Sequence, residues 1–458
     1  MKRFITTLKN IWSITELRNR ILTTLIVLVV YRFGSYIVLP GVIPAALDAQ
    51  NAAGDQTNDL IGLINSFTGG AFKNASLLAL GIMPYITSSI VIQLLGFAVP
   101  YFQRLQQKEG ESGRKKLNQI TRLLTVAVTL VQGSGYLTYI STMGAIDPAI
   151  PKAIFWFSNI IILAGGTVLS MWLGERITDR GIGNGVSLLI TVGIIATLPS
   201  ALGFEFQAQL ENNALLLFVL EMALLFVIII LTIMVVQAVR RIQIQFARKA
   251  VGREGSSLPN AGARDYIPLK LNASGVMPII FAQALMFLPS TAMQFASAEA
   301  ASSSSFLIAL NDFASVEYNV IYFLLIFVFT YVYTALLVNP HNYSEYLKRQ
   351  NAFIPGVKPG VPTAEYIDNI TSRITLPGAL FLGLIAILPA FAAAFGVNRS
   401  FSIFFGGTSL LILVAVVLDT LAQIESYLLM RRYDGLVKSG KVQGRQTGSR
   451  LQGLGNEI

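Results

Sequence analysis

The chain has 458 residues, of which 53% are hydrophobic and only 13% are charged, whereas soluble domains carry roughly 25% charged residues. One buried core does not account for so much apolar sequence, and runs of about 20 apolar residues, the length that crosses a bilayer, recur along the chain. Cysteine is absent from the sequence, which excludes disulfides, structural thiolate metal sites and a cysteine nucleophile. The composition predicts a multi-pass membrane protein.

Ten apolar runs are long enough to cross the membrane as helices. The first run follows several basic residues and has no small-residue cleavage site close behind it, so we expect an uncleaved span and not a signal peptide. The pattern predicts an all-α polytopic membrane protein. The ten expected spans cover residues 21–40, 76–98, 121–141, 153–174, 184–201, 214–239, 273–293, 318–339, 374–395 and 406–428.

The net charge of +10 first indicates how the chain is oriented in the membrane. Most of the 34 Lys and Arg residues fall on one side of the ten spans, and the loops of the opposite side are acidic. By the positive-inside rule the basic side is cytoplasmic, so both termini are expected there. A cytoplasmic partner of the basic loops is a second interpretation. The basic stretches are the N-terminal segment 1–20, the loops 99–120, 175–183, 240–272 and 340–373, and the tail 429–458.

Two short motifs occur twice, each time five spans apart. GIMPYI (81–86) is matched by GVMPII (275–280), and GVSLLI (185–190) is matched by GTSLLI (407–412). An odd number of crossings reverses the direction of the chain, so each copy runs antiparallel to its match. This arrangement predicts two inverted five-helix halves with the functional axis between them. The expected halves are 21–201 and 202–428.

Three segments outside the spans have distinct compositions. Residues 58–68 read as an apolar helix too short to span, followed by Gly69 and Gly70. We expect this helix to re-enter the membrane or to cover something, and a helix resting on the outer leaflet is the alternative. The loops 240–272 and 340–373 combine Pro, Gly and charge, which predicts exposed protrusions.

The sequence lacks the common motifs of hydrolytic chemistry. It contains no phosphate-binding loop, no Gly-x-Ser-x-Gly elbow and no His-Glu-x-x-His site. The one histidine, His341, is expected to face solvent. Three charges fall within expected spans, Arg32, Glu221 and Asp419, but they are scattered over three helices. This favours structural pairing or snorkelling over an ion-coupling site. Energy for transport must therefore come from a partner or a gradient.

β-Branched apolar residues recur at matching positions of the four motif helices. If these helices face a central axis, the residues form an apolar constriction that excludes ions by dewetting and recognises no solute. Ordinary interhelical packing with Ser and Thr as hydrogen-bonding glue is the alternative interpretation of the polar positions. The residues of the expected constriction are Ile82, Ile86, Val186, Ile190, Ile280 and Ile412.

The same motifs resemble the SecY family, the channel subunit of the protein-conducting translocon. The resemblance covers nearly the whole chain and is carried by five segments in order. It implies a central pore in which the six residues of the expected constriction form a ring. It also implies a plug at about 58–71 that seals the resting channel. The segments are LALGIMPYITSSIVIQLL (78–95), MWLGERITDRGIGNGVSLLI (171–190), VYTALLVNP (332–340), FIPGVKPGVPTAEYID (353–368) and FFGGTSLLILV (404–414).

The resemblance also implies a lateral gate between the second and seventh spans. Thr87, Ser88, Ser89, Gln93 and Gln283 would line the seam of this gate, and its hinges would be Gly81, Pro84, Gly275 and Pro278. It further implies that cytoplasmic partners dock at Arg240, Arg241 and Lys358. The family usually has Arg where this chain has Lys358, and Lys lacks the planar fork that makes bidentate contacts.

The implied function is the central channel of the Sec translocon in the bacterial plasma (inner) membrane. Such a channel passes unfolded secretory proteins across the membrane and releases transmembrane segments sideways into lipid. It is a passive channel, not an enzyme, and needs no cofactor or metal. The implied partners are SecE, SecG, the SecA motor, the ribosome, signal sequences and nascent chains, and further SecDF and YidC. A secondary transporter of small solutes is the runner-up, and a non-transport scaffold or insertase is the third hypothesis.

Overall fold

The structure is a computed structural model, and it describes residues 12–47, 59–107, 110–246, 264–295, 309–310 and 312–438. Three expected features lie wholly or partly outside these residues. They are most of the N-terminal segment 1–20, the tip of the loop 240–272 (residues 247–263), and the tail from residue 439 onward.

Each expected span holds one helix. Among the described residues, four short helices and one 3-10 turn lie between them: α4 (Asp59–Thr68), α6 (Pro100–Gln107), α15 (Pro340–Arg349), α17 (Arg399–Ser402) and η1 (Ile403–Phe405). The ten helices in the expected spans are α2 (Thr15–Gly34), α5 (Met83–Ala98), α7 (Gly110–Thr142), α8 (Lys152–Arg180), α9 (Gly185–Glu211), α10 (Leu215–Gln237), α11 (Met277–Phe295), α14 (Val316–Leu337), α16 (Val361–Ala394) and α18 (Gly407–Lys438).

Not all ten helices meet the criteria for a membrane span. Within the described residues, seven segments are long and apolar enough, and the bent pair α5 and α6 would make an eighth. The seven are α7, α8, α9, α10, α14, α16 and α18. The other two helices do not meet the criteria. α2 contains three arginines, and the apolar stretch found in α11, Met277–Met286, is too short. The number ten therefore stays a prediction.

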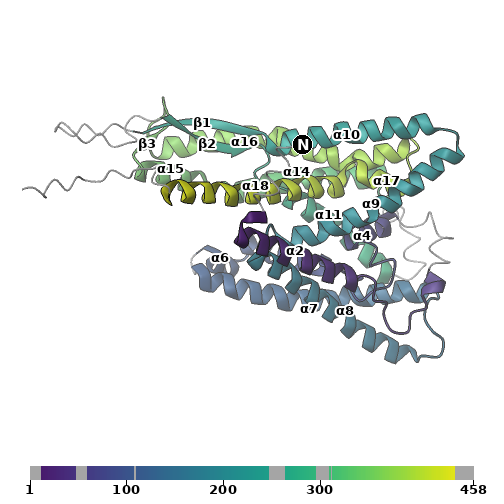
Figure 1. The fold of residues 1–458 in the computed structure, drawn as a ribbon. Helices are drawn as coiled ribbons and strands as arrows, with labels where there is room; N and C mark the ends of the chain where they lie inside the picture. Colours follow the sequence, from purple (N-terminus) through teal and green to yellow (C-terminus); the bar gives the residue numbers. More distant parts are fainter. Residues whose placement is uncertain are drawn as a thin grey trace, which may run out of the picture.

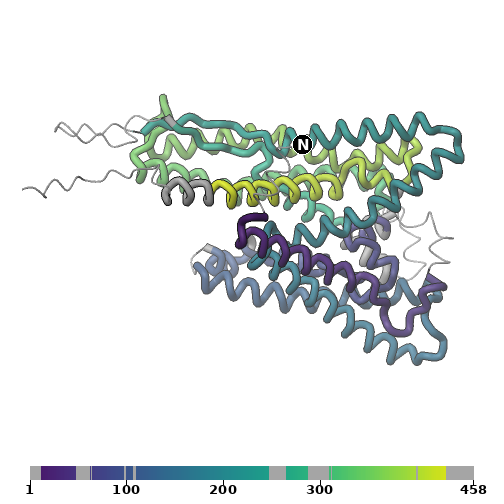
Figure 2. The backbone as a smooth tube through the Cα atoms, viewed as in Figure 1, coloured from purple at the N-terminus to yellow at the C-terminus, as the bar shows by residue number. Residues whose placement is uncertain are grey.

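The helices form two groups with a shared core. Figures 1 and 2 show α2, α6, α7 and α8 on one side and α10, α14, α16 and α18 on the other, with α4, α9 and α11 between them. The largest hydrophobic cluster draws side chains from both groups. Outward-facing side chains such as Leu216 and Leu220 of α10 are apolar and exposed. This is the surface expected of helices surrounded by lipid.

Matched backbone contacts in the two groups bear out the inverted repeat. After α2, the N–H of Leu77 donates to the carbonyl oxygen of Ile37 at 2.7 Å. After α10, the N–H of Leu271 donates to the carbonyl oxygen of Ala238 at 2.8 Å. Each leucine lies four residues before the glycine that opens the repeated motif. The chain therefore makes the same turn back into the membrane in both halves.

A glycine of a later helix packs against each of these turns. A Cβ atom built on Gly166 of α8 would lie 2.1 Å from the carbonyl oxygen of Leu77. A Cβ atom built on Gly378 of α16 would lie 2.8 Å from the carbonyl oxygen of Leu271. Both helices approach the turn so closely that a side chain has no room. The pair of contacts repeats the same architecture in the two halves.

The motif glycines and prolines begin helices and do not kink them. The second and seventh spans were expected to begin at 76 and 273, but α5 begins at Met83 and α11 at Met277. Gly81 and Gly275 lie just before these starts with φ of +52° and +64°, a region that glycine adopts without strain. Pro84 and Pro278 fall in the first helical turn, where no backbone N–H is needed. The expected hinge residues therefore lie at the beginnings of two helices and not within them.

A three-stranded sheet covers the end of the molecule that holds the long basic loops. It consists of β1 (Val239–Phe246), β2 (Arg264–Lys270) and β3 (Ala352–Phe353), antiparallel in the order β2-β1-β3. Ile242 and Ile244 of β1 are buried in a small core with Leu347 of α15 and Ile367 of α16. The sheet is an addition to the expected helical bundle, and it joins the two loops at their bases. The alternation in RRIQIQF was the missed strand signal.

Candidate functional site

The six residues expected to form an apolar constriction lie in one hydrophobic cluster. Four are buried, and the other two are half-buried and pack against the same cluster. They belong to α5, α9, α11 and α18 or directly precede them, so each half contributes two helices. The buried four are Ile82, Ile86, Ile190 and Ile412, and the half-buried two are Val186 and Ile280.

Two of these side chains meet over a glycine of α8. A Cβ atom built on Gly174 would lie 3.4 Å from Cδ1 of Ile82 and 3.5 Å from Cγ2 of Val186. The β-branched side chains of α5 and α9 therefore fill the space that the glycine leaves. This contact joins the two motif helices of the first half at the cluster.

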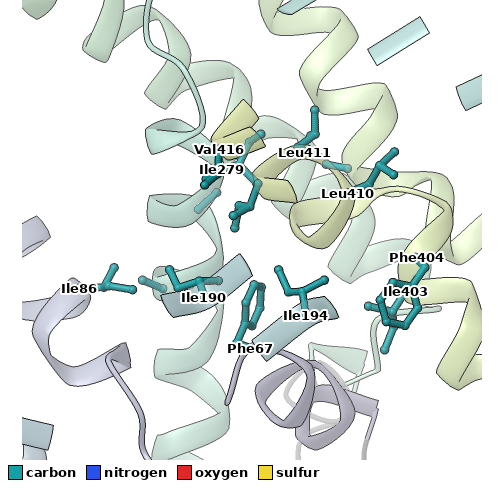
Figure 3. Close-up of a cluster of buried hydrophobic side chains, with 14 of the residues drawn as sticks. Phe67, Ile86, Ile190, Ile194, Ile279, Ile403, Phe404, Leu410, Leu411 and Val416 are labelled. Atoms are coloured by element: carbon teal, nitrogen blue, oxygen red, sulfur yellow. The ribbon is translucent and has the colours of Figure 1, made fainter. Parts of the chain in front are cut away.

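The short helix α4 inserts into the same cluster. Figure 3 shows the ring of Phe67 between Ile190 and Ile194 of α9, below Ile279 of α11. Phe67 is 6% exposed, and Ser66 and Thr68 beside it are also buried. The helix does not rest on the outer surface of the bundle, which was the alternative considered for residues 58–68. Phe67 is a site residue that the sequence interpretation missed.

The end of α4 lies directly on the backbone of α9. A Cβ atom built on Gly193 would lie 2.4 Å from the carbonyl oxygen of Phe67. Gly69 follows the helix with φ of +66°, and its own Cβ would lie 2.8 Å from Cα of Gly193. Thr68 also contacts the start of α5, with its Cγ2 at 3.3 Å from a Cβ built on Gly81. Two glycines therefore allow α4 to be seated against α9.

Arg32 of α2 holds the same end of α4. Its guanidinium donates one hydrogen bond from Nη1 to the carbonyl oxygen of Gly69 and another from Nη2 to the hydroxyl of Tyr36, the latter at 3.0 Å. The guanidinium carbon lies 4.9 Å from the centre of the Tyr36 ring. This intramembrane charge therefore bonds to the short helix and its surroundings, which is the structural pairing that the sequence favoured.

Two of the hydroxyls expected at the gate seam are bonded within α5. Thr87 Oγ1 donates to the carbonyl oxygen of Met83 at 3.1 Å, and Ser88 Oγ donates to that of Pro84 at 2.8 Å. Ser88 is fully buried. Such bonds to the preceding turn satisfy Ser and Thr inside apolar helices. These two side chains make no hydrogen bond across the seam among the described residues.

The polar contact that does cross the seam involves Ser89 and Gln93. Gln93 donates from Nε2 to Ser89 Oγ at 3.2 Å, and its Oε1 accepts a hydrogen bond from the hydroxyl of Tyr333 on α14. Phe281 of α11 packs against Tyr333 with ring centroids 4.7 Å apart. This group therefore joins α5, α11 and α14. Tyr333 was not singled out from the sequence, because nothing local marks it among the aromatic residues of its span.

Gln283 lies elsewhere. It is buried on α11 and lines a cavity with residues of α14, α16 and α18. The cavity has no lining residue from α5. Of the five residues expected at the seam, the structure thus brings together Ser89 and Gln93. Gln283 lies on the side of α11 that faces α14, α16 and α18, which we call the cavity behind the gate helix.

The expected docking residues lie on the sheet end of the molecule, at the left of Figure 1. Arg240 and Arg241 are exposed on β1, and the guanidinium carbon of Arg241 lies 4.8 Å from the centre of the Tyr266 ring. Lys358 is exposed in the loop before α16, and its carbonyl oxygen accepts a hydrogen bond from Thr363 Oγ1 at 2.8 Å. All three side chains are available to a partner.

The remaining intramembrane charges are not clustered with Arg32. Glu221 of α10 is buried beside Gln209 of α9, whose Nε2 donates to Glu221 at 3.5 Å and to Glu205 at 2.8 Å. Asp419 is exposed on α18. No group of three or more His, Asp or Glu residues in the described part of the chain is placed to hold a metal ion. The three intramembrane charges therefore lie at separate places in the structure, Arg32 beside α4, Glu221 beside Gln209 and Asp419 on the surface of α18.

The described features define a class of protein, a multi-pass membrane channel with two inverted halves, an apolar cluster on the axis between them and a short helix inserted into it. A profile of the SecY family matches residues 76–421. The protein translocase subunit SecY of Streptomyces scabiei is 41% identical over 434 residues, 92% of this chain and 97% of that protein. The chain belongs to the SecY family and forms the protein-conducting channel of a translocase.

Two solved structures share the fold at low sequence identity. One, reporting that the SecY plug domain stabilises the closed translocation channel and maintains a membrane seal, has a TM-score of 0.63 at 16% identity, covering 92% of this chain and 94% of that chain. The other, Sec61 in the canine ribosome–channel complex, has a TM-score of 0.57 at 16% identity and the same coverage.

Proposed function

We propose that the six clustered residues form the ion seal of the channel and that α4 is its plug. The observation that carries this proposal is the convergence of four motif helices and Phe67 in one buried apolar cluster. An apolar constriction keeps ions out by dewetting, and it recognises no particular solute. Flexible aliphatic side chains therefore suit a pore that must close around chains of any sequence.

We further propose that the two halves, 21–201 and 202–428, separate along the seam of α5, α11 and α14 to form a lateral gate. The hydrogen bond between Gln93 and Tyr333 favours the closed gate. Swinging α5 and α11 about Gly81 and Gly275 would open a path to lipid for signal sequences and transmembrane segments. Two helix beginnings in equivalent places support this motion.

The channel is passive in this proposal, and its partners supply the energy. SecA or the ribosome docks on the exposed Arg240, Arg241 and Lys358, and the proton-motive force adds to transport. SecE and SecG are the small membrane subunits, with SecDF and YidC as further partners. The described parts of the loops 240–272 and 340–373 lie at the same end of the molecule, which supports both termini in the cytoplasm, and the similarity to bacterial SecY proteins supports the inner membrane.

A crosslinking experiment tests the seal. Photocrosslinkers at Ile86, Val186 and Ile280 are expected to capture a secreted precursor that is stalled in transit, because the chain must pass this cluster. Leu216, exposed on α10 with 84% of its surface accessible, is the matched control and should capture lipid instead. Capture at Leu216 alone would rule out the assigned pore.

Replacing Arg32 with methionine is expected to increase the ion leak of the resting channel. The change keeps an unbranched apolar stem but removes the guanidinium and its hydrogen bond to Gly69, and a bond to a charged group contributes about 2 kcal/mol. Ion flux through proteoliposomes measures the leak, which should rise several-fold. Tyr36→Phe is the control, since it removes only the second acceptor. An equal leak in the two variants would contradict a role of Arg32 in holding α4.

Replacing Tyr333 with phenylalanine is expected to ease gate opening. The change removes the donor to the half-buried Gln93 and so removes a hydrogen bond of the closed state, a loss of about 1 kcal/mol. A precursor with a weakened signal sequence should therefore be exported faster, relative to one with a strong signal. Tyr331→Phe, at a ring that packs on Phe327 and away from this bond, should leave the ratio unchanged. An unchanged ratio in Tyr333→Phe would exclude the bond as a gate contact.

A further inference from the structure

We propose that the cavity behind the gate helix is a binding site for one or two water molecules, which bridge Gln283, Tyr318, Tyr322 and Ser409. The cavity lies between α11, α14, α16 and α18. It is separate from the gate contact at Gln93, which faces Tyr333. Nothing in the proposed seal or gate uses these four side chains together.

The first observation is that the cavity collects buried polar atoms without protein partners. Among the described residues, eight buried side-chain atoms have no hydrogen-bond partner in the protein, and four of them line this one cavity. The four residues are each at most 3% exposed. A buried polar group without a partner costs about 1–3 kcal/mol. Gln283 and Tyr318 lie close enough to act on each other, but Tyr322 and Ser409 have no protein partner, and four such polar groups around one small cavity point to a shared ligand.

The four atoms come from three helices. They are Nε2 of Gln283 on α11, the hydroxyls of Tyr318 and Tyr322 on α14, and Oγ of Ser409 on α18. Tyr318 and Tyr322 are one turn apart, with ring centroids 5.7 Å from each other. Both hydroxyls therefore face the cavity from the same side of α14, opposite the residues of α16 and α18.

The size and chemistry of the cavity select the ligand. About 20 Å³ is open to the centre of a water-sized molecule, and roughly 10–15 Å³ is enough to hold one water. The lining contains hydroxyl and amide groups and no charged side chain, so it offers neither a counter-charge for an anion nor a carboxylate for a cation. A small neutral molecule that both donates and accepts hydrogen bonds fits, and water is that molecule.

Bound water at this place would connect the gate to the seal. Gln283 lies three residues after Ile280, and Ser409 lies three residues before Ile412, so water-mediated bonds would run between helices that carry two ring residues. A water bridge can lengthen or re-form when α11 swings, whereas a direct bond would break. This last consequence rests on the proposed gate, but the binding site itself does not.

A double-mutant cycle on the purified translocase complex tests the site. Tyr322→Phe and Ser409→Ala are each expected to lower the midpoint of thermal unfolding by about 1–3 °C, because each removes a bond to the water. The double variant should lose little more than either single variant, since both act through the same bridge. Tyr136→Phe calibrates the loss, because its buried hydroxyl donates to the carbonyl oxygen of Phe72 at 2.7 Å.

Two results would overturn the site. If the cavity is dry, removing an unpaired hydroxyl should raise the midpoint or leave it unchanged, and the two effects should simply add. Likewise, an electron cryo-microscopy map that resolves ordered water elsewhere in the complex should show density within hydrogen-bonding distance of at least two of the four atoms. A map with ordered water but none here refutes the proposal. Neither measurement depends on transport, so failure here leaves the proposed channel function standing.

Discussion

Replacing Gly193 with alanine is expected to unseat α4 and to raise the ion leak of the resting channel by about fivefold or more. The new Cβ would lie 2.4 Å from the carbonyl oxygen of Phe67, and neither backbone can yield without moving one helix. Overpacking of this kind costs about 1–3 kcal/mol. The short helix α4 is the element free to move, so the cost falls on the closed state. Ion efflux from proteoliposomes measures the effect.

The same helix offers a matched control. Gly203 also lies in α9, and a Cβ built on it would meet nothing within 4 Å. Gly203→Ala should therefore leave the leak at the parent level. If Gly193→Ala leaks no more than Gly203→Ala, then α4 does not seal the channel by resting on α9. Active export by Gly193→Ala would show that the leak does not come from misfolded channels.

Replacing Gly166 with alanine is expected to prevent stable folding of the first half. The Cβ would lie 2.1 Å from the carbonyl oxygen of Leu77, at the turn that leads the chain back into the membrane before α5. Both partners are backbone within packed elements, so we expect a destabilisation of about 3 kcal/mol or more. The yield of folded protein and the midpoint of thermal unfolding should both fall sharply.

The neighbouring glycine separates this effect from the loss of a glycine as such. A Cβ on Gly165 would meet nothing within 4 Å, and Gly→Ala at an unhindered helical position stabilises by about 0.5–1 kcal/mol. Gly165→Ala should therefore fold normally. Gly378→Ala, at the matching position of the second half, should be destabilised less than Gly166→Ala because its contact distance is 2.8 Å. Equal stability of the two α8 variants would disprove the close approach.

In the proposed channel, the seal formed by the six residues and the plug formed by α4 would be joined through few contacts. Phe67 packs among the isoleucines of α9, while Arg32 holds the carbonyl oxygen of Gly69. Apolar contacts stabilise α4 in many orientations, whereas the directional hydrogen bond from Arg32 holds its end at one position. A passing chain must displace both, and both can re-form after it has left. The resting seal is therefore reversible without any covalent or nucleotide chemistry.

Local sequence was sufficient for the helices and for grouping the six β-branched residues in one apolar cluster. Hydrophobic length and hydropathy are properties of consecutive residues, and a helix lies within or across each expected span for that reason. The repeated motifs predicted the inverted halves, since the direction of each copy follows from counting spans. The same β-branched positions, including Ile86, Ile190 and Ile412, are found together in one cluster. The alternating polar and apolar residues of RRIQIQF also predict a strand. The Gly, Pro and charged residues of the same loop favoured an irregular protrusion instead.

The contacts that decide how the channel closes could not be predicted in the same way, because they join residues far apart along the chain. Arg32 and Gly69 are separated by 37 positions, and Gln93 and Tyr333 by 240. No local pattern distinguishes Tyr333 from the other aromatic residues of its span, or Gly193 from a glycine such as Gly203. The sequence by itself determined the membrane class, the two inverted halves and the residues that meet in the apolar cluster. Only the tertiary structure decided that Gly81 and Pro84 lie at the beginning of a helix and that Gln283 faces a polar cavity. It also decided that α4 packs on Gly193 and that Arg32 bonds to its end. Each of these features depends on which backbone surfaces approach one another.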